Sequence, residues 1–237
     1  RASSQQEISL MSNDADSMLL IGTGDLEDES DVEIQNGDIT VNGTLNMGAD
    51  AEYTSDMGIT VPDGSALNIP MLTKAQMAKK ACDITCEQGA SVSYAGIDII
   101  GGENPLLALE SGSTVINLSN AESGDISLKL EGTASVISEL KALVQSADAS
   151  DNIVPFNVEL IKDSSVTVAE GASLYIPKNG KFTIDEGAAL SVIGILTSSP
   201  NASISVNGEF NIPLLSKAQI AEIESPVYIN GAGSVFN

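Results

Sequence analysis

The chain repeats a short pattern in which apolar and polar positions alternate. Ile39-Thr-Val41 is followed by Asn42-Gly43 and then by Leu45-Asn-Met47. Clear further copies occupy residues 59–69, 166–176, 182–192 and 204–212, and weaker copies surround Gly89, Gly112, Gly132 and Gly231. Alternation with a period of two predicts strands with one buried face, and a glycine after Asn, Asp or Glu supplies a corner of positive φ. Each module is therefore expected to be strand, corner, strand.

The length of the module decides between two all-β folds. Strands of three or four residues are too short for stable hairpins, whereas stacked coils let each strand pair with its equivalents in neighbouring coils. We therefore predict a parallel β-solenoid (β-helix) of about nine to ten coils over residues 36–237. Because Asn-Gly between strands is also a hairpin signal, an antiparallel β-sandwich is the alternative. The expected inward residues are Val41, Leu45, Val61, Ile69, Val168, Leu174, Ile184, Val206 and Ile212.

A long internal duplication overlies the short module. Residues 67–78 match residues 210–221 at eight of twelve positions, and the match extends to whole blocks, 36–94 and 179–237. Residues 1–35 do not fit the repeat, so we expect an acidic N-terminal segment that serves as a cap or as a donor to a neighbouring subunit.

Two or three short helices are expected at coil corners. Thr73 and Ser216 are each followed three residues later by glutamine, which is the signature of a capping box at a helix start. A third helical stretch, residues 139–146, follows Ser138 in the same way.

Charge and composition exclude several classes of function. The chain has 33 acidic and 10 basic residues, a net charge of −23, and no histidine. Binding of nucleic acid or of an anionic membrane needs a basic surface that this chain lacks. The absence of histidine removes the commonest general base and zinc ligand, which argues against an enzyme. No apolar run approaches the roughly 20 residues of a membrane span, and we expect any secretion signal to have been removed.

Three local patterns could carry chemistry. Ser138-Glu-Leu-Lys141 has the Ser-x-x-Lys spacing of serine acyl enzymes, but the companion motifs are missing, so we interpret Ser138 as a helix cap. Residues 25–33 contain six acids that can bind Ca²⁺, although the spacing is not that of an EF-hand and a solvated run is the alternative. Asn42, Asn117 and Asn201 begin glycosylation sequons.

Cys82 and Cys86 are the two cysteines of the chain. A local disulfide is favoured if the segment curls. In one extended strand the pair would be about 13 Å apart, and buried free thiols would result. No cofactor and no catalytic residue is expected.

Residues 110–118 and 170–176 resemble the β-helical repeats of pectin-lyase-like and adhesin-like surface proteins of prokaryotes. This resemblance implies an extracellular or cell-surface location and a structural, adhesive or glycan-associated role. It transfers no catalytic residue to this chain.

Our first functional hypothesis is a structural subunit that assembles with itself, head to tail, into an extracellular filament or surface layer. The alternatives are a monomeric adhesin or glycan-binding module and a carbohydrate-active enzyme. Solenoids need capped ends to avoid stacking, and we expect residues 227–236 to form an open apolar coil. The residues assigned to the assembly interface are Ile8, Leu10, Leu19, Leu20, Val227, Ile229, Val235 and Phe236.

Overall fold

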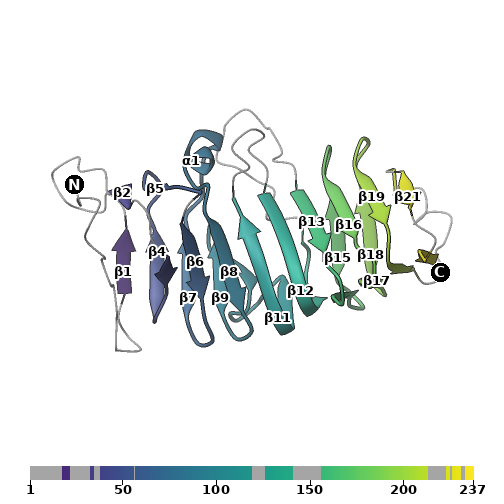
Figure 1. The fold of residues 1–237 in the computed structure, drawn as a ribbon, viewed down its shortest axis with the longest axis horizontal. Helices are drawn as coiled ribbons and strands as arrows, with labels where there is room; N and C mark the ends of the chain where they lie inside the picture. The colour runs from purple at the N-terminus through teal and green to yellow at the C-terminus, as the bar shows by residue number, and fades with distance from the viewer. Residues whose placement is uncertain are drawn as a thin grey trace.

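The computed structural model describes residues 18–21, 33–34, 38–55, 57–118, 126–140, 156–212, 223–224, 226–230 and 233–237. The chain forms an elongated β-solenoid of about 7 turns, with strands that lie across the long axis (Figure 1). The expected fold class is confirmed.

Each coil of the solenoid runs over three faces. Face 1 contains β3 (Ile39–Thr40), β6 (Gly58–Val61), β8 (Asp83–Glu87), β13 (Phe156–Leu160), β16 (Lys181–Ile184), β19 (Ser203–Val206) and β21 (Val227–Ile229). Face 2 contains β1 (Met18–Ile21), β4 (Thr44–Met47), β7 (Ala66–Ile69), β9 (Ser91–Tyr94), β14 (Ser165–Val168), β17 (Ala189–Val192), β20 (Glu209–Asn211) and β22 (Val235–Phe236). Face 3 is narrower and contains β2 (Glu33–Ile34), β5 (Glu52–Tyr53), β15 (Ser173–Ile176) and β18 (Ile195–Ser198).

Strands of successive coils pair in parallel, which overturns the β-sandwich alternative. The strands on either side of Asn42-Gly43 pair with the next coil: β3 with β6 and β4 with β7, both parallel. β16–β19 and β17–β20 repeat this arrangement in the second half. Alternate residues point inward and form one continuous apolar core. Eight of the nine expected inward residues are buried; Ile212 is only partly buried, because it follows the last residue of β20 near the open end of the stack.

Two consecutive strands run backwards through the parallel stack. β9 turns through Ala95-Gly96 into β10 (Ile97–Ile100), which is antiparallel to β9, and the chain continues in the same direction as β11 (Leu107–Asn117), which is parallel to β10 and antiparallel to β8. β12 (Ile126–Val136) restores the original direction and pairs in parallel with β13 and β14. The expected coil count was too high because this reversed segment adds modules to the sequence without adding a forward coil.

β11 and β12 each bend from one face to the next at a glycine. Gly112 and Gly132 are directly opposite each other in the antiparallel ladder, with φ of 83° and 133°. A Cβ at Gly112 would lie 1.9 Å from the Glu131 carbonyl oxygen, and one at Gly132 would lie 2.1 Å from that of Ser111. The two backbones can approach this closely only because both residues lack side chains.

The helix α1 (Lys74–Ala78) begins at the expected capping box. The Gln76 backbone N–H donates to Thr73 Oγ1 at 3.2 Å, and the Thr73 backbone N–H donates to Gln76 Oε1 at 3.0 Å. The equivalent helix after Ser216 lies outside the described residues. The helix expected from residue 139 is wrong at its start, because Glu139 instead forms a parallel bridge to Ser173 and extends face 3.

The duplication is structural as well as sequential. Strands β3 to β9 of residues 36–94 and strands β16 to β22 of residues 179–237 follow the same order of faces, with β5 and β18 in equivalent places on face 3. β1 and β2 add a further partial coil through parallel pairing with β4 and β5. Part of the segment expected to lie outside the repeat, residues 1–35, therefore joins the solenoid.

Candidate functional site

The last described coil carries four of the eight residues assigned to an assembly interface. Val227 and Ile229 lie on β21, and Val235 and Phe236 lie on β22, at the end of the molecule opposite β1 (Figure 1). Ile229 and Phe236 occupy inward rows, opposite Val206 and Phe210, yet they are 54% and 48% exposed. No strand of the described residues pairs with the outer edge of β21 or β22.

The first copy of the duplication shows what a covered edge looks like. Cys86 and Val92 hold the same inward rows as Ile229 and Phe236, opposite Val61 and Leu67, and are 0% and 1% exposed. They are covered because β11 pairs with β8 and β10 pairs with β9. The exposed apolar residues of the second copy are therefore ordinary core positions that lack the next strand.

Tyr228 is an exposed aromatic residue of the last coil that the sequence pattern did not single out. It is 51% exposed on the outward row of β21, opposite Ser205. A tyrosine that follows Thr183 and Ser205 in this row was the available signal. The Phe236 ring packs edge-on against the Phe210 ring, with 5.4 Å between centroids. This contact stabilises the end of β22, although the outer edge of β22 has no paired strand among the described residues.

The other assigned residues lie at the opposite end or outside the described structure. Leu19 and Leu20 are in β1, at the register positions of Leu45 and Asn46. This pairing adds β1 to the first coil of its own chain. Ile8 and Leu10 lie outside the described residues.

Both end strands belong to uncharged stretches of an acidic chain. Residues 17–24, around β1, and residues 226–237, which include β21 and β22, contain no charged side chain. The net charge of −23 is therefore carried by other residues, among them the six acids of residues 25–33.

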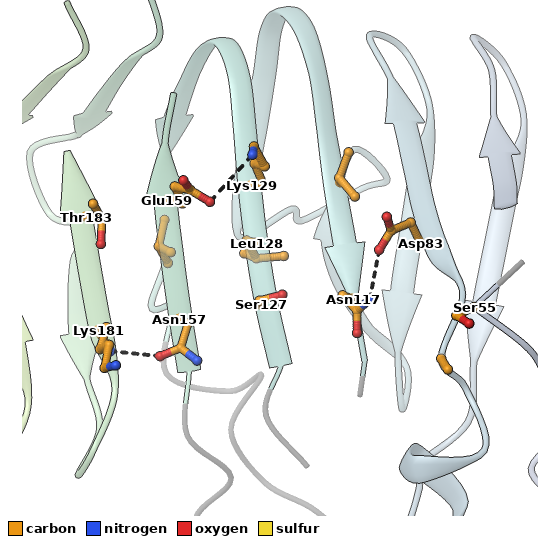
Figure 2. A pocket seen from close by; sticks show the side chains of 13 residues that line it. Ser55, Asp83, Asn117, Ser127, Leu128, Lys129, Asn157, Glu159, Lys181 and Thr183 are labelled. Carbon is orange, nitrogen blue, oxygen red and sulfur yellow. Dashed lines mark hydrogen bonds and ion pairs between the residues drawn. The ribbon is translucent and has the colours of Figure 1, made fainter. Parts of the chain in front are cut away.

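A groove of about 550 Å³, lined by both polar and apolar side chains, crosses face 1 in the middle of the molecule (Figure 2). It runs over β8, β11, β12, β13 and β16. The Asn117 amide donates to Asp83 at 2.8 Å, the Lys181 backbone N–H donates to Asn157 Oδ1 at 3.0 Å, and Lys129 forms an ion pair with Glu159 at 3.7 Å. Ser55, Ser127 and Thr183 add hydroxyl groups to the lining. No local pattern in the sequence predicts this groove, because most of its lining residues come from five separate strands.

A buried lysine stabilises a corner of the first copy. Lys80 is 0% exposed, and its ammonium donates to the carbonyl oxygens of Ala49, at 2.8 Å, and of Ala51. Nζ also lies 5.6 Å from the centre of the Tyr53 ring. Burial lowers the pKa of Lys80 to about 8 and raises the pKa of Tyr53 above its ordinary range. The carbonyl contacts give Lys80 a structural role.

The disulfide favoured between Cys82 and Cys86 is not present. Both cysteines are free and buried. Cys86 lies in β8 and Cys82 immediately precedes it, so extended chain separates the two sulfur atoms. Burial raises the pKa of Cys82 to about 11 and that of Cys86 to about 12, which keeps both thiols protonated.

The remaining candidates give no site in the described structure. Of the acidic run, residues 25–32 lie outside the described residues and Glu33 is in β2. Among the residues that are described, no group of three or more His, Cys, Asp or Glu is placed to hold a metal. Of the sequon residues, Asn42 and Asn201 are exposed at corners and Asn117 is hydrogen-bonded in β11.

The described part of the chain contains no helix with the length and apolarity to cross a membrane. No family model matches the chain, and the comparisons with curated proteins and with solved structures likewise found no match.

Proposed function

We propose that this chain is a non-catalytic structural subunit that assembles with itself into an extracellular filament or surface layer. The observation that carries the proposal is the open coil of β21 and β22, where core positions of the repeat stay exposed. Tyr228, Ile229, Val235 and Phe236 are between 43% and 54% exposed there. An edge of unpaired strands with apolar residues is a template for another strand.

The occupant of this edge is proposed to be a second copy. Residues 17–24 around its β1 are also uncharged, and β1 carries an open edge among the described residues, because its pairing is with β4 alone. Ile8 and Leu10 lie outside the described residues, and their place in this interface rests on the sequence alone.

The extracellular location rests on the resemblance to adhesin-like and pectin-lyase-like repeats and remains part of the proposal. The strongly acidic composition agrees with it, because such a surface repels nucleic acid and anionic lipid.

Phe236→Asp tests the assembly. The variant places a charge at the open edge and should abolish polymers seen by sedimentation velocity and negative-stain microscopy, while circular dichroism stays that of the wild type. Ile193→Asp is the matched control, because Ile193 is 59% exposed but lies on the side of the solenoid after β17. Polymers that persist in Phe236→Asp, or a wild type that is a monodisperse monomer at high concentration, would remove the filament proposal.

The groove on face 1 favours a second candidate, binding of a neutral glycan by a surface adhesin. Amide, hydroxyl, carboxylate and ammonium groups converge there, and such groups bind sugar hydroxyls. Affinity electrophoresis in gels containing a neutral glucan or xylan tests this. Retardation should be lost in Lys129→Ala and Lys181→Ala and kept in Lys162→Ala, whose lysine lies outside the groove.

A further inference from the structure

We infer that two copies join by a parallel pairing of β22 with β1 of the next copy, in the register that places Phe236 opposite Leu19. This inference rests on the proposed function and specifies the strands, direction and register of the contact. The assembled solenoid would then continue across the junction with face 2 unbroken.

The direction follows from how each end strand already pairs. β1 pairs in parallel with β4, and β22 pairs in parallel with β20, both on face 2. A strand that continues the stack beyond β22 in the same winding is therefore also parallel. The two end strands lie at opposite ends of the molecule, so the contact is head to tail and can propagate (Figure 1).

The register follows from the inward rows. Phe236 continues the row of Leu190 and Phe210, and Leu19 holds the row of Leu45 and Leu67 at the other end. Placing Phe236 opposite Leu19 joins these rows into one core. A slip by one residue would move every inward side chain to the outer face, so it is strongly disfavoured. In the joined register Asn237 lies opposite Leu20, because Asn237 follows Phe236 and Leu20 follows Leu19.

Charge supports the same junction. Residues 17–24 and 226–237 are free of charged side chains, whereas the whole chain carries a net charge of −23. Pairing β22 with β1 brings these two stretches together and buries no ionised side chain of either strand, which avoids an uncompensated desolvation cost.

A cysteine cross-link tests the register in the full chain. Leu20→Cys combined with Asn237→Cys is oxidised under conditions in which sedimentation shows polymers. Directly opposed positions on adjacent strands meet the distance limits of a disulfide. The double variant should give a ladder of covalent dimers, trimers and longer chains on a non-reducing gel. The native thiols do not compete, because Cys82 and Cys86 are 1% and 0% exposed.

Two controls separate the possible outcomes. Each single variant can give at most a covalent dimer, because a ladder needs both ends. The slipped pair, Leu19→Cys with Asn237→Cys, should cross-link about tenfold less, because its side chains point to opposite faces. Polymers without a ladder, or a stronger ladder from the slipped pair, overturn the inferred register and leave the proposed function standing. A wild type without polymers removes the proposed function itself.

Discussion

The two copies of the duplication differ in what covers their last coil. In the first copy, β8 and β9 are covered by β11 and β10, and the inward residues of that coil are buried. In the second copy, the equivalent strands β21 and β22 have an open edge among the described residues, and residues in the same rows are about half exposed. Burial in this fold is thus decided by the next strand in the stack, not by the coil itself.

The copies also differ at one corner of face 3. Lys80 forms a bridge to Tyr53 in the first copy, whereas Ile223 forms the equivalent bridge to Ser198 in the second. The first copy therefore contains the buried ammonium of Lys80, two buried thiols, and the buried phenols of Tyr53 and Tyr94. The corresponding positions of the second copy, Ile223, Ser198, Ser225 and Ile229, do not ionise near neutral pH.

Truncation of equivalent residues should give the largest contrast between the copies. Ile84 and Val227 occupy equivalent inward positions on β8 and β21, but Ile84 is 0% exposed and Val227 only partly buried. Ile84→Ala should lower the free energy of unfolding by about 2–5 kcal/mol, and Val227→Ala by less than about 1 kcal/mol. Urea denaturation at low protein concentration measures both. Equal losses would show that the last coil is covered within the monomer.

The bend of the reversed strand β11, which pairs with β8 of the first copy, can be disrupted by a substitution. Gly112→Ala should cost about 3 kcal/mol, because a positive φ and a contact with the Glu131 carbonyl both oppose the new Cβ. Gly64→Ala is the matched variant: φ is +74° but nothing lies within 4 Å of the added Cβ. It should cost about 1 kcal/mol. Thermal unfolding compares the two, and similar costs would contradict the close approach of β11 and β12.

Alkaline pH should weaken the first copy specifically. The pKa of Cys82 is raised from 9.0 to about 11 and that of Cys86 from 9.0 to about 12, so these thiols ionise more readily in the unfolded chain. Their contribution to stability is complete below pH 9 and is lost as the pH rises through 9–12. Each thiol should lower the free energy of unfolding by about 1.4 kcal/mol per pH unit in its window.

Titration of Lys80 has the opposite effect on the pH dependence of stability. Its pKa is lowered from 10.5 to about 8, so its titration adds stability between pH 8 and 10.5 and offsets one thiol. Urea midpoints at pH 8, 9.5 and 11 should therefore fall most steeply above pH 10.5. Cys86→Val should make that fall shallower by about 1.4 kcal/mol per pH unit. An unchanged slope in Cys86→Val would contradict the assignment.

The outward amide ladders should give the smallest effect, similar in both copies. Asn68 donates to Asn46 at 2.9 Å and accepts from Ser93 at 2.8 Å. The equivalent Asn211 accepts from Asn237 at 2.7 Å. Because these bonds are exposed, Asn68→Ala and Asn211→Ala should each cost about 1 kcal/mol or less. A much larger loss of unfolding free energy for Asn211→Ala would indicate that the hydrogen bonds of Asn211 lie in a buried contact.

The sequence predicted the repeat well because local rules determine it. Period-two alternation fixed which residues point inward, the glycine corners fixed where strands turn, and Thr73 with Gln76 marked the start of α1. The parallel stacking also followed from strand length.

The reversed direction of β10 and β11 could not be predicted, because apolar and polar residues alternate in the same way in parallel and antiparallel strands. Gly112 and Gly132 were correctly expected at corners, but only the pairing shows that they face each other. At the start of the helix expected after Ser138, the local capping pattern was overridden by pairing of Glu139 with Ser173, and residues 141–146 lie outside the described residues. The groove on face 1 was missed because register, not sequence distance, brings Asp83 and Lys181 to the same surface.

The orientation of the strands also determines how the molecule responds to force. Interstrand hydrogen bonds run close to perpendicular to the strands, and the strands lie across the long axis (Figure 1). Tension applied between β1 and β22 therefore acts on the interstrand pairings one after another along the stack. The coils should separate one at a time. The two-residue pairings of β20 with β22 and of β3 with β6 should yield early, and the long ladder of β11 with β12 last. Under load the chain should extend in discrete steps of one coil, starting from its ends.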